Sequence, residues 1–288
     1  MIRLQAVTLL VAALILAGCG AAPQNQTSIT NQPATQPSST SGSSSGSSSA
    51  GSSSSGSSSG GSSSSNPPSS IVPAGAKTIA DIQKLPSWGS CSSNCAGEAG
   101  TDAVYSMESG IASPSLSGSA IKFNITGGTP WADALWWKQI GSNDTITHFA
   151  YEMSYYLTNP AAAQALEFNV NQNAGGWRYE YATQCDIRGA GVWRIWDHSQ
   201  MHWVATTAPC PTPSANTWNK LTWEFERTSD HKVVWVAVTL NGVRSAVNQS
   251  FDGFTASGSG IDVAFQMDSD GGPTPWSVWV DNISLSEW

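Results

Sequence analysis

The chain has 288 residues, a formal net charge of −8 at pH 7 and 14 tryptophans. The acidic balance argues against a nucleic-acid partner, because no basic stripe is present to neutralise phosphates. It also disfavours an anionic polysaccharide as a ligand.

Residues 1–19 predict a lipoprotein signal peptide. A charge at Arg3 precedes an apolar run of about a dozen residues, which is shorter than the roughly 20 that a membrane-spanning helix needs. The run ends in Leu16-Ala17-Gly18-Cys19, which resembles the lipobox of bacterial lipoproteins. The resemblance implies export, lipidation of Cys19 and anchoring to the bacterial cell envelope by several acyl chains. The alternative is an ordinary secretory signal with an unrelated cysteine.

Residues 20–76 predict a disordered linker rich in Ser and Gly. Between residues 41 and 65 only Ser, Gly and Ala occur. Such a segment cannot bury enough apolar surface to offset the entropy lost on ordering. As a random coil of about fifty residues it would have an r.m.s. reach on the order of 40 Å, so we expect a tether.

Residues 77–288 hold all 14 tryptophans and suit one domain of about 210 residues. From residue 120 onward, period-two alternation between turn residues predicts an all-β fold, a two-sheet antiparallel β-sandwich of the jelly-roll kind. Short helices are expected only within 79–85 or 160–164, and Asn241-Gly242 predicts a hairpin turn. The expected strands are 120–125, 145–157, 165–171, 177–184, 192–196, 220–227, 233–240, 243–249, 261–268 and 276–285.

Four cysteines remain after Cys19. An even number in an exported domain predicts disulfides, with three connectivities open. We favour Cys91 with Cys95, which would close a short loop, and Cys185 with Cys210, which would close a Trp-rich excursion.

Alternation also separates the two faces of the strands. Aromatic, amide and carboxylate side chains share the outward face, which is typical of the floor of a binding cleft rather than of a solvated surface. The outward set on which this prediction depends is Glu167, Asn169, Asn171, Glu224, Trp235, Gln266 and Asp268.

More tryptophans are expected in loops at the rim of this cleft. A pyranose ring offers an apolar C–H face for stacking and a rim of hydroxyls for planar amides and carboxylates. About half of the tryptophans should fill the core instead. The rim candidates are Trp131, Trp136, Trp137, Trp193, Trp196 and Trp203, with Trp137 and Trp193 as sugar-stacking residues.

The segments AYEMSYYL, ALEFNVNQ, GIDVAFQMDSD and SVWVDNISLSEW resemble the concanavalin A-like lectin and glucanase superfamily over about residues 105–288. The resemblance implies a jelly roll. Retaining β-glucanases of glycoside hydrolase family 16 in that superfamily carry E-x-D-x-E on a cleft strand. This chain has Glu167, Asn169 and Asn171 there, so only the position of the nucleophile matches.

A glycosidase needs two carboxyl groups, and the second could come from another strand, as in the similar family 12 enzymes. Asp268 is the first candidate for this partner of Glu167, and Glu224 or Glu226 the second. The alginate lyases of the same superfamily need Arg, Gln, His and Tyr together. Residues of three of these types occur in this chain, but not in the order of a lyase motif. They are Arg178, Tyr179, Tyr181, Gln184 and Arg188.

The expected metal content is small. By resemblance to jelly-roll sugar-binding domains, Glu108 and Asp281 would hold a structural Ca²⁺, the alternative being a turn Glu and a strand-end Asp. The spacing of His198 and His202 suggests a zinc site as an alternative to the disulfides. Export disfavours this alternative, because the cysteines of an exported domain are not expected to remain as thiolate ligands. No cofactor is otherwise required.

Three hypotheses of function follow. The first is a monomeric, surface-tethered lipoprotein that binds neutral polysaccharide, with membrane contact through the lipid anchor alone. The second is a glycoside hydrolase with Glu167 as nucleophile or base. The third is an adhesion or structural lipoprotein whose aromatic face binds a protein partner.

Overall fold

The computed structural model describes residues 71–92 and 103–288. The predicted signal peptide with Cys19, the predicted linker up to residue 70, and Cys95 lie outside these residues. No helix within the described residues is long and apolar enough to cross a membrane. The elements are β1 (Lys77–Ile79), η1 (Ile82–Lys84), β2 (Gly89–Ser92), β3 (Val104–Ile111), β4 (Ala120–Thr126), β5 (Pro130–Gly141), β6 (His148–Leu157), η3 (Pro160–Ala162), β7 (Ala163–Ala174), β8 (Trp177–Tyr181), β9 (Thr183–Cys185), β10 (Val192–Asp197), β11 (His202–Pro209), β12 (Trp218–Arg227), β13 (Lys232–Leu240), β14 (Val243–Asp252), β15 (Phe254–Thr255), β16 (Gly260–Asp270) and β17 (Trp276–Glu287).

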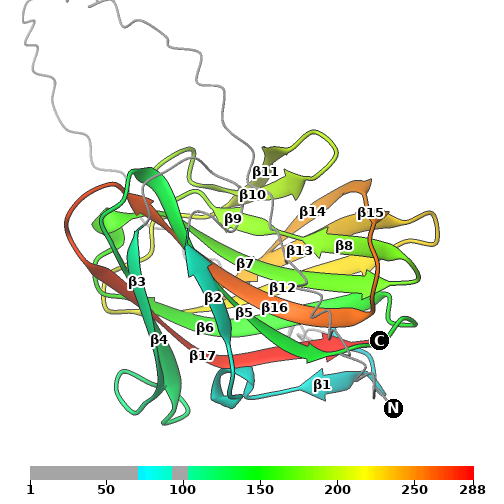
Figure 1. The fold of residues 1–288 in the computed structure, drawn as a ribbon, viewed down its shortest axis with the longest axis horizontal. Coiled ribbons are helices and arrows are strands. Elements are labelled where there is room, and N and C mark those ends of the chain that lie inside the picture. Colours follow the sequence, from blue (N-terminus) through cyan, green and yellow to red (C-terminus); the bar gives the residue numbers. More distant parts are fainter. Residues whose placement is uncertain (1–70, 93–102) are drawn as a thin grey trace, which may run out of the picture. The chain divides into compact units, whose positions relative to one another are not determined.

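Two antiparallel sheets form a sandwich (Figure 1). The eight-stranded sheet has the order β14-β13-β12-β6-β17-β4-β3, with β1 paired to β17. The nine-stranded sheet has the order β11-β10-β9-β7-β16-β5-β2, with β8 paired to β7 and β15 to β8. The predicted fold class, an all-β two-sheet antiparallel sandwich, is confirmed.

The structure contains strands where the sequence predicted loops. Residues 130–141 form β5 and residues 202–209 form β11, so Trp131, Trp136, Trp137 and Trp203 lie on strands rather than in rim loops. In β5 both Leu135 and Trp136 are buried, although they face opposite sides. Large apolar residues on both faces remove the alternation on which the strand prediction depended.

Aromatic rings from the two sheets meet in the core. Trp193 of β10 lies edge-on to Trp223 of β12, with ring centroids 5.2 Å apart. Phe123 of β4 packs against Trp136 and Phe265 of the other sheet, both at 4.7 Å. Trp193 is fully buried, so its predicted role in stacking against a sugar is wrong.

Trp235 is also buried, against the prediction that it points outward. It packs in the core against Phe251 and Tyr181. Along 233–240 nearly every residue is apolar, so alternation does not mark which set is inward. Burying an indole removes far more apolar area from water than burying Val234, and a register shift after Trp235 then restores Val238 to the core.

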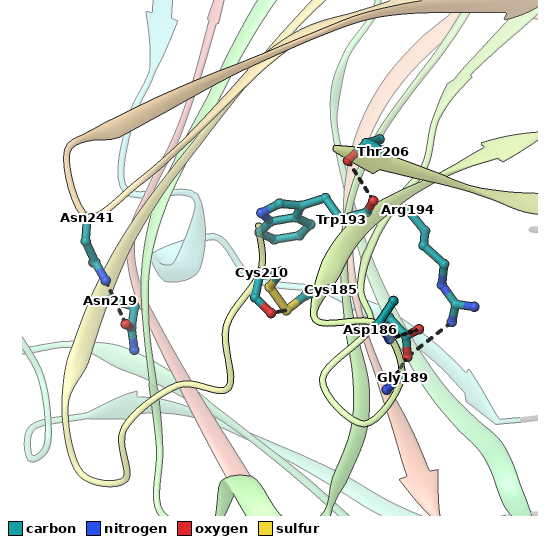
Figure 2. Close-up of a disulfide and its surroundings, with 10 residues drawn as sticks. Cys185, Asp186, Gly189, Trp193, Arg194, Thr206, Cys210, Asn219 and Asn241 are labelled. Carbon is teal, nitrogen blue, oxygen red and sulfur yellow. Dashed lines mark hydrogen bonds and ion pairs between the residues drawn. A yellow bond between two sulfur atoms is a disulfide. The ribbon is translucent and has the colours of Figure 1, made fainter. Parts of the chain in front are cut away.

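The predicted disulfide between Cys185 and Cys210 is present, with a Cα–Cα distance of 5.6 Å (Figure 2). It joins the end of β9 to the segment after β11, and both residues are buried. Cys91 is disulfide-bonded as well. The Cys185–Cys210 bond therefore closes the β10–β11 hairpin onto the sheet.

We predict that replacing both Cys185 and Cys210 by Ser lowers the free energy of unfolding by about 3 kcal/mol, because a closed loop of 25 residues no longer restricts the unfolded chain. Urea unfolding followed by tryptophan fluorescence measures the change. Ser245→Ala on β14 is the control and should leave the midpoint in place. Equal midpoints for the double variant and wild type would contradict the prediction.

Candidate functional site

A row of paired residues crosses the nine-stranded sheet on the side away from the core. Arg194 of β10 pairs with Gln184 of β9, Gln184 with Glu167 of β7, Glu167 with Gln266 of β16, and Gln266 with Leu135 of β5. Residues paired across antiparallel strands project on the same side. We call this side of the nine-stranded sheet the polar face.

Two side-chain amides lie between two carboxylates in this row. Gln184 Nε2 donates to Glu167 Oε1 at 2.9 Å and to Asp268 Oδ2 at 3.0 Å. Gln266 Nε2 donates to Glu167 Oε1 at 3.1 Å and to Asp268 Oδ1 at 2.9 Å. Asn169 Nδ2 donates to Glu167 Oε2 at 3.3 Å. These five residues are the amide–acid cluster, and four of them were predicted from the sequence.

The orientation of two of the amides is fixed from outside the cluster. Gln184 Oε1 accepts from the Arg194 guanidinium, so its NH₂ group must point toward the acids. Asn169 Oδ1 accepts from the backbone N–H of Thr183 at 2.9 Å, which turns its NH₂ group toward Glu167. Arg194 in turn lies 3.5 Å from Asp186 (Figure 2). The donors are therefore preorganised.

The cluster is buried, and this changes its protonation. Glu167 is 4% exposed and Asp268 is 2% exposed. Burial, with a smaller contribution from the nearby charge of Asp133, raises the pKa of Glu167 to about 8, against the hydrogen bonds from Asn169 and Gln184 and the charge of Arg194. Glu167 is therefore mostly uncharged at neutral pH.

Tryptophans border the cluster on the same face. Trp137 of β5 pairs with Ala264, and Ala264 pairs with Asn169 of the cluster, so this part-exposed indole stands in the same row as Asn169. Its ring lies over Gly89 of β2, where a Cβ atom would come within 2.3 Å of Trp137 Cε2. Gly89 therefore makes room for the ring.

Trp131 meets Arg194 from across the sheet. The Arg194 Cζ atom lies 5.2 Å from the centroid of the Trp131 ring. Their strands, β5 and β10, are separated in the sheet by β16, β7 and β9, so the contact spans the strands that carry the cluster. Trp131 has a φ of 72°, which costs a bulky residue about 1–3 kcal/mol.

A second polar group follows along the same face. Asn171 donates to Asp262 Oδ1 at 2.8 Å and pairs with Glu180 of β8. Glu180 lies 3.3 Å from His198 Nδ1, whereas His202 is exposed on β11. Within residues 71–92 and 103–288 no three His, Cys, Asp or Glu residues gather as metal ligands, so the zinc alternative has no support here.

Glu224 and Glu226 are not part of the site. Both lie on β12 in the eight-stranded sheet. Glu224 binds Arg244 through both carboxylate oxygens, at 2.7 and 2.8 Å, and Glu226 lies 3.8 Å from His148. The two faces of β12 were predicted correctly, since Leu221, Trp223 and Phe225 are buried, but alternation does not show to which sheet a strand belongs.

The predicted calcium ligands do not come together. Glu108 pairs with Lys122 at 3.2 Å, and Asp281 accepts from the hydroxyls of Ser115 and Ser117 at 2.6 and 2.7 Å. Burial raises the pKa of Asp281, but these hydrogen bonds outweigh it and hold the pKa at about 2.

The partners of Asp281 do not fit Ca²⁺, which needs oxygen lone pairs. Gln83 Oε1 accepts from the backbone N–H of Ile283, so the side chain presents its NH₂ group to Asp281, at 3.1 Å. The other groups that reach Asp281 are hydroxyls and backbone N–H groups acting as donors. Asp281 therefore joins chain segments as a hydrogen-bond acceptor.

Comparison with known proteins gives structural similarities only. No protein-family model and no curated protein matches the sequence. The structure is similar to one described under carbohydrate-binding modules of the β-sandwich superfamily (12% identity, TM-score 0.38), covering 70% of this chain but only 58% of that one. It is also similar to a cellulose induced protein, Cip1 (12%, TM-score 0.45, 72% and 96% covered), and to an alginate lyase in complex with alginate trisaccharide (10%, TM-score 0.42, 73% and 98%). Function therefore has to be inferred from the chemistry of the polar face itself.

We predict that Glu167 makes stability fall with rising pH. Its folded-state pKa of about 8 lies above the ordinary 4.5, so between these values the unfolded chain releases a proton that the folded protein keeps. The stabilisation is full below about pH 4.5 and is lost by about pH 8. Urea unfolding across this window should show a shallower decline for Glu167→Gln than for wild type, with exposed Glu108→Gln as the control. Parallel declines in all three proteins would contradict the assignment.

Proposed function

We propose that the polar face of the nine-stranded sheet binds a neutral polysaccharide. The observation that carries this proposal is the amide–acid cluster beside the part-exposed Trp137 on one face. Fixed amides and carboxylates suit paired hydrogen bonds with sugar hydroxyls, and an indole suits the C–H face of a pyranose. An ordinary solvated sheet face does not need donors whose orientation is fixed.

The charges on this face favour a neutral ligand. Glu167 is mostly uncharged at neutral pH. Arg194 already lies 3.5 Å from Asp186, and Arg178 lies 4.0 Å from Glu180. A uronic acid polymer would have to draw one of these arginines away from its carboxylate partner, which costs free energy.

Binding in this proposal requires Trp131 to move. The contact between Trp131 and Arg194 spans the buried cluster, so a sugar reaches the amides when that contact opens. Release of the positive φ at Trp131 would offset part of the cost of opening. Arg194 can then donate to the ligand while still holding Gln184.

We extend the proposal to the cell envelope. The disulfide between Cys185 and Cys210 is typical of exported proteins. A lipidated Cys19 and the linker of residues 20–76 would hold the domain at an r.m.s. distance on the order of 40 Å from the membrane. The protein would then retain polysaccharide close to its own cell.

We predict that the full chain is retarded in native gels that contain β-glucan, xyloglucan or galactomannan, and that Trp137→Ala weakens binding about tenfold, or about 1.4 kcal/mol. Gly89→Ala should weaken binding too, because its Cβ displaces the Trp137 ring. Trp288→Ala, which removes a ring stacked on His148, is the matched control. If Trp137→Ala binds as well as wild type, the polar face is not the binding site. If no polysaccharide retards wild type, the proposal fails and the protein-partner hypothesis gains.

A glycoside hydrolase is the second candidate, favoured by the positions of the two acids. Because Glu167 and Asp268 accept from the same amide nitrogens, their nearest oxygens lie within about 6 Å of each other. Retaining glycosidases separate their carboxyl groups by about 5–5.5 Å. The raised pKa of Glu167 suits a general acid. Against catalysis, both Glu167 oxygens already accept hydrogen bonds from amides.

Reducing-sugar release from the same polysaccharides separates the two candidates. As a binding protein, wild type should release no more sugar than Glu167→Gln or Asp268→Asn. Turnover by wild type that either substitution lowers by about a thousandfold or more would instead establish the hydrolase. Trp137→Ala serves as the control for lost binding, since it leaves both acids in place.

A further inference from the structure

The outer face of the eight-stranded sheet carries an aromatic row that the polar face does not explain. Trp218 of β12 pairs with Tyr156 of β6, and Tyr156 pairs with Trp279 of β17. The neighbouring Tyr155 and Val278 are buried in the core, so these three rings project to the outside. All three are part-exposed. We call Trp218, Tyr156 and Trp279 the aromatic row.

The three rings are in contact and evenly spaced. Tyr156 lies 5.4 Å from Trp218, tilted by 49°, and 5.7 Å from Trp279, nearly perpendicular at 89°. Since neighbouring strands lie about 4.8 Å apart, the two indoles stand about 10 Å apart across the sheet. This spacing places an indole under alternate sugars of an extended chain. Because the planes of the three rings differ, they suit a single polysaccharide chain that twists along its length rather than the flat surface of a crystalline polysaccharide.

Amides and hydroxyls flank the row. The Tyr156 hydroxyl donates to Asn216 Oδ1 at 3.1 Å. On the other side, Asn124 accepts from Ser277 at 2.6 Å and donates to Ser106 at 3.1 Å. These groups lie at the surface and can exchange partners with sugar hydroxyls.

The charges beside the row are balanced. Lys122 pairs with Trp279 in the sheet register, and its Nζ lies 5.5 Å from the centroid of that ring and 3.2 Å from Glu108. The ion pair leaves no net charge to attract an acidic or basic partner. A neutral ligand with apolar faces and hydroxyl edges matches this surface best.

We propose that the aromatic row is a second binding site, for a single neutral polysaccharide chain, on the sheet opposite the polar face. It does not depend on the first site, because the two sites share no residue and lie on different sheets. One molecule with both sites holds two chains, or two parts of one chain, and gains apparent affinity for long polymers.

The test compares four full-length proteins in native gels that contain xyloglucan, mixed-linkage β-glucan or galactomannan. They are wild type, Trp137→Ala, the pair Trp218→Ala with Trp279→Ala, and the triple variant. Each partial variant should bind about tenfold more weakly than wild type, and the triple variant should not bind. Trp279→Phe, which keeps a stacking ring, should bind like wild type and shows that the loss is not misfolding.

The outcomes separate the two sites. If the Trp218/Trp279 variant is retarded like wild type by every polysaccharide that retards wild type, the second site is overturned and the first stands. If that variant loses binding while Trp137→Ala does not, the second site stands and the first is overturned. If no polysaccharide retards wild type, both are overturned.

Discussion

The polar face depends on two amide nitrogens that two buried acids share. Gln184 Nε2 and Gln266 Nε2 each lie within 3.1 Å of an oxygen of Glu167 and of Asp268. Two carboxylates buried side by side repel each other unless donors stand between them or one takes up a proton. Both effects reduce the repulsion here, since the amide groups lie between the two acids and the pKa of Glu167 is raised to about 8. Without either amide, a buried acid would lose a donor that water cannot easily replace.

Strand pairing places these groups, and covalent and ionic contacts then hold them. β9 has three residues, yet it carries Gln184 and ends at Cys185, whose disulfide to Cys210 ties it down. Arg194 from the next strand turns the Gln184 amide toward the acids. The disulfide is therefore part of the support of the site as well as of the fold. Reduction should loosen β9 before it disturbs the core strands.

The sequence predicted the sandwich and much of the cluster, because strands 165–171 and 261–268 alternate cleanly and leave Glu167 and Gln266 opposite the apolar set. The prediction was wrong at Trp235, because valines on both faces of this strand leave no alternation to show which residues point inward. It did not assign Gln184 to the cluster and missed Arg194, since their positions depend on β9 lying beside β7 and β10, a tertiary pairing. Arg194 lies between the buried Trp193 and Ile195, but alternation alone does not show what its side chain contacts.

The central claim is that the amides of the cluster are ligand donors and not merely the filling of a buried polar layer. Side-chain amide NMR signals of Gln184, Gln266 and Asn169 test this most directly, followed in the full chain during titration with an oligosaccharide of a polymer that retards the protein. The account predicts that all three shift together and saturate with the binding isotherm. Binding that leaves these three signals in place would contradict it.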